Sequence, residues 1–391
     1  MKFKTFTKAL ILSIFIFETI KFYSFYIEYS SWQYGDWLIN YQGGFIRRGL
    51  IGEIFFQAHK FTSIHLDKII FSSVIVFYFL FSLLLIKSIK YFEKSKLDYF
   101  LFLSPGFFLY PVMNSEIIGR KDIILVLVVG VFVFFHDIFK KNLNFILLIF
   151  FIILLTFSHS GFLFYTQYLM AIYFFSQYKT FKSFENWKLV VYIFLIIILA
   201  LLLNKFQGNE FQVEQICQSV KNYSPNNCEN TGQIGWLLNN MSSYLGEKMA
   251  IGFANIINYI IIYSIAFYLF FIFLIKKLNN SKFTITLKNL KFIKPVTLFL
   301  FLILLSLPIF ILARDWGRYI HLSYSCSILL YIYLVKNHLI VSNKINLPKI
   351  FNKKYIFILI IFAYSFFWTV PFYDAKFIKF TLAKPIINLI D

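Results

Sequence analysis

The chain has 391 residues, of which 59% are hydrophobic, 22% are aromatic and only 14% are charged. This leaves too little polar surface to coat a water-soluble domain of this length, so the composition predicts an all-α, polytopic integral membrane protein. The formal net charge of +20 is not gathered into a basic arm or joined to an aromatic platform for bases, which argues against nucleic acid as a partner.

Apolar blocks of about 15 to 25 residues recur along the chain, and each is long enough to cross a bilayer as a tilted helix. They predict about 11 transmembrane helices in a single transmembrane domain over residues 1–391. Because the third, fourth and fifth blocks are short, a break or a re-entrant piece is expected there. The approximate spans are 9–26, 69–86, 99–113, 123–136, 145–158, 162–177, 189–204, 251–275, 295–313, 322–335 and 355–372.

The first block has no small-residue cleavage site after it, so we expect a retained helix rather than a signal peptide. It continues through Glu18 and Lys21, which are about one turn apart and can form an ion pair. The distribution of lysines then sets the orientation, because Lys and Arg in short loops stay on the cytoplasmic side.

With the N-terminus in the cytoplasm, the predicted inner segments carry 23 basic and only four acidic residues, and the rest of the chain is nearly balanced. The positive charge is therefore interpreted as a topology signal. The inner segments are 1–8, 87–98, 137–144, 178–188, 276–294 and 336–354.

The long loop 205–250 is predicted to be an extracytoplasmic excursion rather than a separate domain. Cys217 and Cys228 both lie in it, where an oxidising compartment would allow a disulfide that closes a short loop. Cys326 sits inside an apolar block, which is typical of a small core residue.

In the first outer loop, two glycines precede Arg47 and Arg48. From Phe45 onward the apolar residues fall on one helical stripe, which predicts an interfacial helix with Arg47 at its head. Two arginines in a first turn oppose the helix dipole, so the pattern favours an anionic ligand such as phosphate or diphosphate. Alternatively, the arginines contact lipid headgroups or pair with Glu53.

Asp36 lies earlier in the same loop, among aromatic residues and without a basic neighbour in sequence. A carboxylate in a partly desolvated cavity can act as a general base for a hydroxyl nucleophile. The alternative is a turn or helix-capping aspartate that follows Gly35.

In the second outer loop, Glu116 and Asp122 bracket Arg120 and Lys121. The two acids could share a divalent cation, but no His or Cys completes a metal set, so we expect no metal. The two cations are candidate phosphate ligands or, alternatively, interface anchors.

Arg314 and Arg318 are four residues apart, so a helix that extends outward would present both guanidinium groups on one face to phosphate oxygens. Asp315 could hold one of them in place, or the group could be an ordinary ion pair at a helix end. His159 lies at a turn between two apolar blocks, where it is a candidate site residue or, alternatively, a packed capping residue.

An acid in the first outer loop, an interfacial helix after it and a second acidic cluster between the third and fourth helices resemble the arrangement in membrane glycosyltransferases of the C-type (GT-C) fold. Arginines late in the chain fit as well, because those enzymes hold the phosphate of a polyprenyl-linked sugar with basic residues. By this resemblance Asp36 matches the first-loop catalytic acid, and Glu116 or Asp122 matches the second-loop acid.

In size and helix number the chain also resembles O-antigen polymerases. These enzymes join repeat units carried on undecaprenyl diphosphate at the periplasmic face of the bacterial inner membrane, in lipopolysaccharide biosynthesis. The Arg-x10-Gly pattern of some of them is absent from the arginine-bearing outer loops. The resemblance implies a polyprenyl-diphosphate-linked glycan as substrate, contact with membrane lipids, no soluble cofactor, and a chain-length regulator protein as a candidate partner.

Two other functions fit the same sequence. One is a GT-C-type glycosyltransferase that adds a single sugar from a polyprenyl-phosphate donor. The other is a flippase or transporter of lipid-linked oligosaccharides, which would place its charges near the bilayer midplane.

Overall fold

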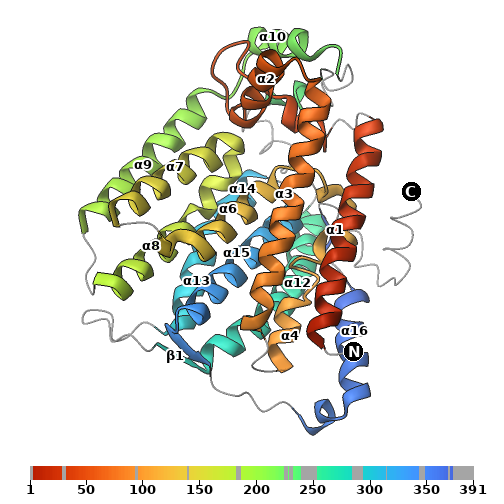
Figure 1. Cartoon of the computed structure of the whole chain (residues 1–391), viewed down its shortest axis with the longest axis vertical. Coiled ribbons are helices and arrows are strands. Elements are labelled where there is room, and N and C mark those ends of the chain that lie inside the picture. Colours follow the sequence, from red (N-terminus) through yellow and green to blue (C-terminus); the bar gives the residue numbers. More distant parts are fainter. Residues whose placement is uncertain are drawn as a thin grey trace.

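The computed structural model describes residues 3–28, 32–92, 96–138, 141–181, 186–223, 228, 232–238, 253–283, 294–313, 315–342, 348–368 and 370–372. Within these ranges the chain is mainly helical, with one pair of short strands (Figure 1). The elements are α1 (Phe3–Ile27), η1 (Gly35–Leu38), α2 (Leu50–Thr62), α3 (Leu66–Ser88), η2 (Ile89–Tyr91), α4 (Lys96–Phe102), α5 (Tyr110–Met113), η3 (Ser115–Ile117), α6 (Asp122–Phe135), η4 (His136–Ile138), α7 (Lys141–Ser158), η5 (Ser160–Tyr165), α8 (Thr166–Phe181), α9 (Asn186–Lys205), α10 (Glu210–Val220), η7 (Gly235–Leu238), α12 (Phe253–Asn279), β1 (Ser281–Phe283), α13 (Pro295–Ser306), α14 (Pro308–Leu312), α15 (Trp316–Lys336), β2 (Ile340–Ser342), η8 (Lys349–Asn352) and α16 (Lys354–Phe366).

Five helical segments of the described chain are long and apolar enough to cross a membrane, in agreement with an all-α membrane protein. The count of about 11 spans and the predicted orientation stay predictions. Other apolar helices, including α6 and α16, are shorter than a full span. The five segments are Lys4–Ile27, Leu66–Tyr91, Trp187–Lys205, Ile260–Asn279 and Pro295–Leu312.

The break expected in the third apolar block is confirmed, because residues 99–113 do not form one continuous helix. Helix α4 ends at Phe102, and the chain turns before the short helix α5 begins at Tyr110. Pro105 has no N–H to donate to a helix, and the Ser104 hydroxyl accepts a 3.1 Å hydrogen bond from the Gly106 N–H, which stabilises the turn. The second loop follows α5 directly, so its position depends on this break.

Helix α15 forms the centre of the bundle, and nearly all of its residues are buried. It packs against α6, α8 and α12, while α3 packs against both α1 and α6. Because α15 is surrounded on several sides, its polar residues must find partners inside the protein. This places the chemistry of its first turn at the junction of several helices.

Helices α2 and α10 lie together at one end of the bundle, opposite the β1–β2 pair (Figure 1). The predicted helix that starts at Phe45 is wrong in its boundary, because α2 begins at Leu50 after Gly49. Arg47 and Arg48 therefore precede the helix rather than occupy its first turn. Whether α2 lies in a membrane interface stays a prediction.

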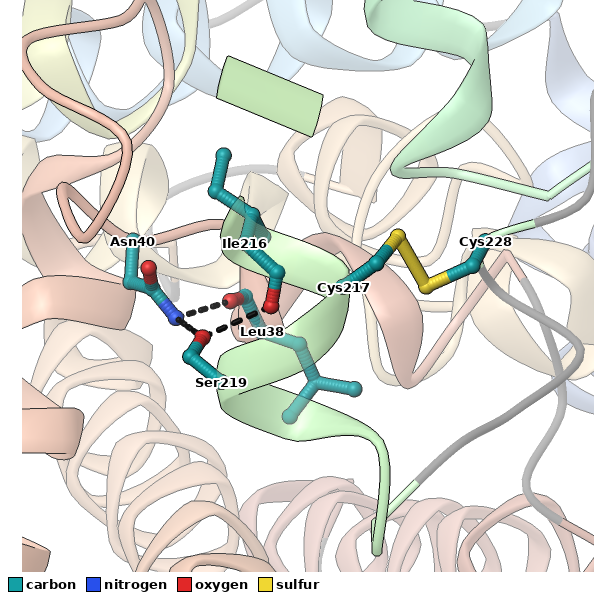
Figure 2. The surroundings of a disulfide bond; sticks show 6 residues. All are labelled: Leu38, Asn40, Ile216, Cys217, Ser219 and Cys228. Carbon is teal, nitrogen blue, oxygen red and sulfur yellow. Dashed lines mark hydrogen bonds between the residues drawn. A yellow bond between two sulfur atoms is a disulfide. The ribbon is translucent and has the colours of Figure 1, made fainter. Parts of the chain in front are cut away.

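The predicted disulfide between Cys217 and Cys228 is confirmed, and Cys326 is a buried free cysteine. Figure 2 shows the disulfide beside α10, where the Asn40 amide donates to Ser219 Oγ at 2.9 Å and to the Leu38 carbonyl. The loop that carries Asn40 and Phe45 is thus fastened to α10. Gln212 of α10 adds a 3.0 Å hydrogen bond to the carbonyl of Phe45.

Candidate functional site

Asp36 lies in the first turn of η1 and is only 4% exposed. The turn is held from two sides. The indole N–H of Trp37 donates to the Gly119 carbonyl of the second loop, and Gly52 of α2 lies so close to the Ile39 and Trp37 carbonyls that no Cβ would fit. Trp37 thus fixes the backbone next to Asp36 against the loop that carries Lys121, and Gly52 allows α2 to pack closely on its other side.

Lys121 is fully buried and joins the first two loops. Its ammonium nitrogen lies 3.7 Å from Asp36 Oδ1 and donates a 2.8 Å hydrogen bond to the Arg48 carbonyl. Arg48 has a φ of 69°, a left-handed conformation that is uncommon for residues other than glycine. Its guanidinium Nε donates to Ser160 Oγ at 3.3 Å, which brings the third outer turn to the same place.

Arg318, in the first turn of α15, is paired with two carboxylates. Its Nε donates to Asp122 Oδ2 at 2.7 Å, and its Nη1 donates to Asp315 Oδ2 at 3.2 Å. Arg120 Nη1 lies 3.6 Å from the same Asp315 oxygen. Asp315 therefore bridges two arginines, whereas Asp122 Oδ1 is buried without a hydrogen-bond partner among the described residues.

His159 faces Arg318, with 3.3 Å between His159 Nε2 and Arg318 Nη2. Burial and four nearby cations lower the pKa of His159 well below its ordinary value, so the ring is neutral at pH 7. Its Nδ1 accepts a 3.2 Å hydrogen bond from the Gly161 N–H, which assigns the single ring proton to Nε2. Nε2–H and the guanidinium are then two adjacent donors, an arrangement that an anionic oxygen would satisfy.

These residues form one connected group, which we term the polar cluster. Four loops or helix starts that are distant in sequence contribute to it. Its cations Arg48, Arg120, Lys121 and Arg318 outnumber its carboxylates Asp36, Asp122 and Asp315 by one, and His159 is neutral. The polar cluster can therefore take a further negative charge, which fits a phosphate better than it fits a cation.

The polar cluster is recessed from the end of the bundle that carries α2. The Gly119 N–H donates to the hydroxyl of Tyr78 at 2.8 Å, and Tyr78 lies about three helical turns into α3. Gly119 itself has a φ of 80°, which a side chain would strain. A ligand of the polar cluster would thus have its charged group about three turns away from the end of α3 that adjoins α2.

Burial lowers the pKa of Lys121 to about 8, although Asp36 partly opposes this shift. The ammonium is mostly protonated at pH 7, and it loses its charge within a pH range that membranes tolerate. The pKa of Arg120 is also lowered by burial, but a guanidinium starts so high that it stays charged.

Three of the predicted site residues are not among the members of the polar cluster. Glu116 has an exposed side chain, and its carbonyl accepts a 2.9 Å hydrogen bond from Arg120 Nε. Arg47 is half-buried, and its backbone N–H donates to the Phe206 carbonyl. Arg314 lies outside the described residues. Since α15 begins at Trp316, Arg318 belongs to this helix rather than to an outward extension of the one before it.

The proposed ion pairs of Glu53 with Arg47 or Arg48 do not form. The carboxylate of Glu53 instead accepts hydrogen bonds from the Tyr41 N–H and from the Gln42 and Gln57 amides. Glu53 therefore shapes the loop that precedes α2, and it leaves both arginines to other contacts.

Sequence reasoning missed two polar neighbours of the cluster. Ser160 is the hydrogen-bond partner of Arg48, and the Gln233 amide lies 3.4 Å from Asp36 Oδ1. It also missed the aromatic surroundings of Arg120, whose guanidinium lies 5.8 Å from the Trp32 ring and 4.7 Å from the Phe372 ring. The proximity of His159 could have drawn attention to Ser160, whereas Gln233 and Phe372 carry no local signal.

No group of three His, Cys, Asp or Glu side chains in the described ranges is arranged to hold a metal ion. Comparison with protein-family models, curated proteins and solved structures finds no match to this chain. The candidate site consequently rests on its own geometry.

Proposed function

We propose that the protein is a polymerase of a surface polysaccharide such as O-antigen, which joins repeat units carried on undecaprenyl diphosphate at the periplasmic face of the inner membrane. The observation that carries this proposal is the polar cluster, in which a surplus cation and two adjacent donors lie beside a buried carboxylate. A glycosyl diphosphate donor needs no soluble cofactor, because the sugar is already activated.

In the proposed reaction Asp36 removes the proton of the acceptor sugar hydroxyl, whose oxygen then bonds to the anomeric carbon of the donor. The bond from that carbon to the diphosphate oxygen breaks, and the diphosphate leaves with the electron pair. Arg48, Arg318 and the Nε2–H of His159 stabilise the charge that develops on it. The Lys121 ammonium, 3.7 Å from Asp36 Oδ1, places a positive charge beside this base.

Two features support this assignment of roles. Asp36 and the donors belong to one contact network, so a base and a phosphate-binding group lie within reach of a single substrate. The recess of the polar cluster below the end of α3 also suits a donor whose lipid chain keeps it in the membrane.

A deletion strain complemented by wild type or Asp36→Asn tests the proposal. We expect the deletion to leave lipid-linked single repeat units, and the expressed Asp36→Asn protein not to restore long chains. Asp67→Asn is the matched control, because Asp67 lies at the start of α3 and accepts from the Tyr26 hydroxyl rather than joining the cluster. Unchanged chain length together with missing whole repeats would overturn polymerisation and favour the transfer of a single sugar from a polyprenyl-phosphate donor.

The same depth supports one candidate of another class, a flippase of lipid-linked oligosaccharides. Charged residues recessed between helices are typical of translocation pathways. A flippase would be indicated by repeat units that accumulate on the cytoplasmic side of the deletion strain.

A further inference from the structure

A cavity lies next to the polar cluster, between α1, α3, α6 and α15. Asp122 belongs to both, since it pairs with Arg318 in the polar cluster and also lines the cavity. The remaining wall is mostly apolar, with residues such as Ile14 and Val126. The cavity thus extends from a charged group into the apolar interior of the bundle.

Glu18 of α1 also lines this cavity and is only 7% exposed. The predicted pairing with Lys21 is wrong, because the Lys21 ammonium lies over the Phe25 ring. No ion pair or side-chain hydrogen bond joins the Glu18 carboxylate to a residue in the described ranges. An ionised carboxylate without a partner is very unfavourable in such surroundings, so Glu18 requires a bound proton or cation.

The groups that face Glu18 across the cavity come from three helices. Helix α3 contributes Tyr78 and Ser82, α6 contributes Asp122, and α15 contributes His321. His321 Nδ1 lies 3.0 Å from the Gly106 carbonyl, which can only accept, so Nδ1 carries a proton. In the neutral ring Nε2 is then a hydrogen-bond acceptor. The segment between α4 and α6 presents only apolar side chains, from Phe108, Pro111 and Ile117.

These neighbours include two hydroxyl groups, which can donate or accept, but no cationic side chain of lysine or arginine. The described carboxylates and histidines also form no group of three that could hold a metal ion. A proton needs only one carboxylate oxygen and a polar route for exchange, and the cavity supplies both at Glu18 and Asp122.

We propose that Glu18 is a proton-binding site inside the membrane domain, and that the cavity and Asp122 connect it to the polar cluster. The Glu18 carboxylate takes a proton from hydronium and returns it to water by the same route, so that charge and atoms balance. This proposal is independent of the reaction at Asp36. It would hold for a polymerase, a single-sugar transferase or a flippase.

Labelling with dicyclohexylcarbodiimide tests the proposal on the full-length protein in membranes. This apolar reagent adds to a protonated carboxyl group as an O-acylisourea, which rearranges to a stable N-acylurea detectable on the peptide by mass spectrometry. We expect label on Glu18 at acidic pH, and at least a several-fold loss of label at alkaline pH. Glu18→Gln should abolish the label, whereas Glu28→Gln, at the exposed end of the same helix, should leave it unchanged.

Asp122→Asn tests the connection. Removal of the negative charge that shares the cavity makes the protonated form of Glu18 less favourable, so the pH at which labelling is half-lost should fall. An unchanged midpoint would overturn the link to the polar cluster. Absence of label at every pH, or equal label at every pH, would overturn exchange at Glu18 itself, without bearing on polysaccharide synthesis.

Discussion

Lys121 Nζ lies 3.7 Å from Asp36 Oδ1, and both side chains are almost completely buried. The two residues come from different loops, and each supplies the opposite charge that the other requires in an apolar environment. The pair also places the candidate base next to the carbonyl of Arg48, to which the same ammonium donates a hydrogen bond. Loss of the Lys121 charge should therefore change the anion affinity of the whole polar cluster.

Anion affinity should fall as pH rises through about 8. Below this pH Lys121 is protonated and the polar cluster carries its surplus cation, whereas above it the ammonium becomes neutral. His159 is neutral throughout this range and does not contribute. Calorimetric binding of inorganic pyrophosphate to the purified protein on either side of pH 8 measures the effect.

Lys121→Arg should retain affinity at the higher pH, because a guanidinium stays charged. Lys60→Arg, on the exposed side of α2, is the control and should behave as wild type. A wild-type affinity that does not depend on pH would contradict the role given to Lys121.

Arg48 should contribute more than Arg47 to the rate of polymer synthesis. Arg48 contacts Ser160 within the polar cluster, whereas Arg47 donates its backbone N–H to Phe206. Asparagine is the appropriate replacement, because it tolerates the left-handed conformation of Arg48. We expect Arg48→Asn to lower the rate of polymer synthesis by roughly 100-fold or more, the magnitude of one lost transition-state donor.

Arg47→Asn is the matched comparison, and we expect a smaller effect, below about tenfold. The measurement is chain extension by membranes that contain equal amounts of each variant. The reverse order of the two effects would transfer the phosphate-binding role from Arg48 to Arg47.

Arg318→Ala should destabilise the protein by about 3–5 kcal/mol, because it leaves the buried carboxylate of Asp122 without its cation. Arg318→Ala combined with Asp122→Asn should recover part of this loss, since no isolated charge then remains. Chemical unfolding in detergent measures both free energies. A double variant less stable than Arg318→Ala alone would show that the pair is not the main source of the effect.

Cys217→Ala should loosen α10 and destabilise the protein by about 2–4 kcal/mol, since it opens the loop closed by the disulfide. It also leaves Cys228 with a free thiol, whose labelling shows on which side of the membrane the loop lies. If the loop is extracytoplasmic, a membrane-impermeant maleimide added outside spheroplasts should label Cys228. Labelling only after lysis would reverse the predicted orientation.

The helical character and the disulfide could be predicted from the sequence, because apolar block length and cysteine position are local signals. The sequence also indicated most members of the polar cluster as separate candidates, including Asp36, Lys121 and Arg318. It could not predict that Asp36 pairs with Lys121, since that contact depends on how the two loops pack.

The boundaries of helices were less predictable. The block at 99–113 is apolar enough for a helix, but Pro105 and its neighbours break it. The apolar stripe after Phe45 also continues into the loop, so periodicity alone placed Arg47 and Arg48 inside a helix that begins at Leu50. In both cases the apolar side-chain pattern covers more residues than the backbone hydrogen bonding that defines the helix.

Helix α6 has 14 residues and is about 21 Å long, whereas a bilayer hydrocarbon core is about 30 Å thick. If its far end lies at the inner surface, Asp122 and the preceding loop lie within the depth normally occupied by acyl chains. Because α6 is buried against α3, α8 and α15, its missing length is not exposed to lipid but is filled by the preceding loop inside the protein. The start of α6 and the polar cluster are thus enclosed by longer helices, α3 with 23 residues and α15 with 21, which separate the charges from the surrounding lipid.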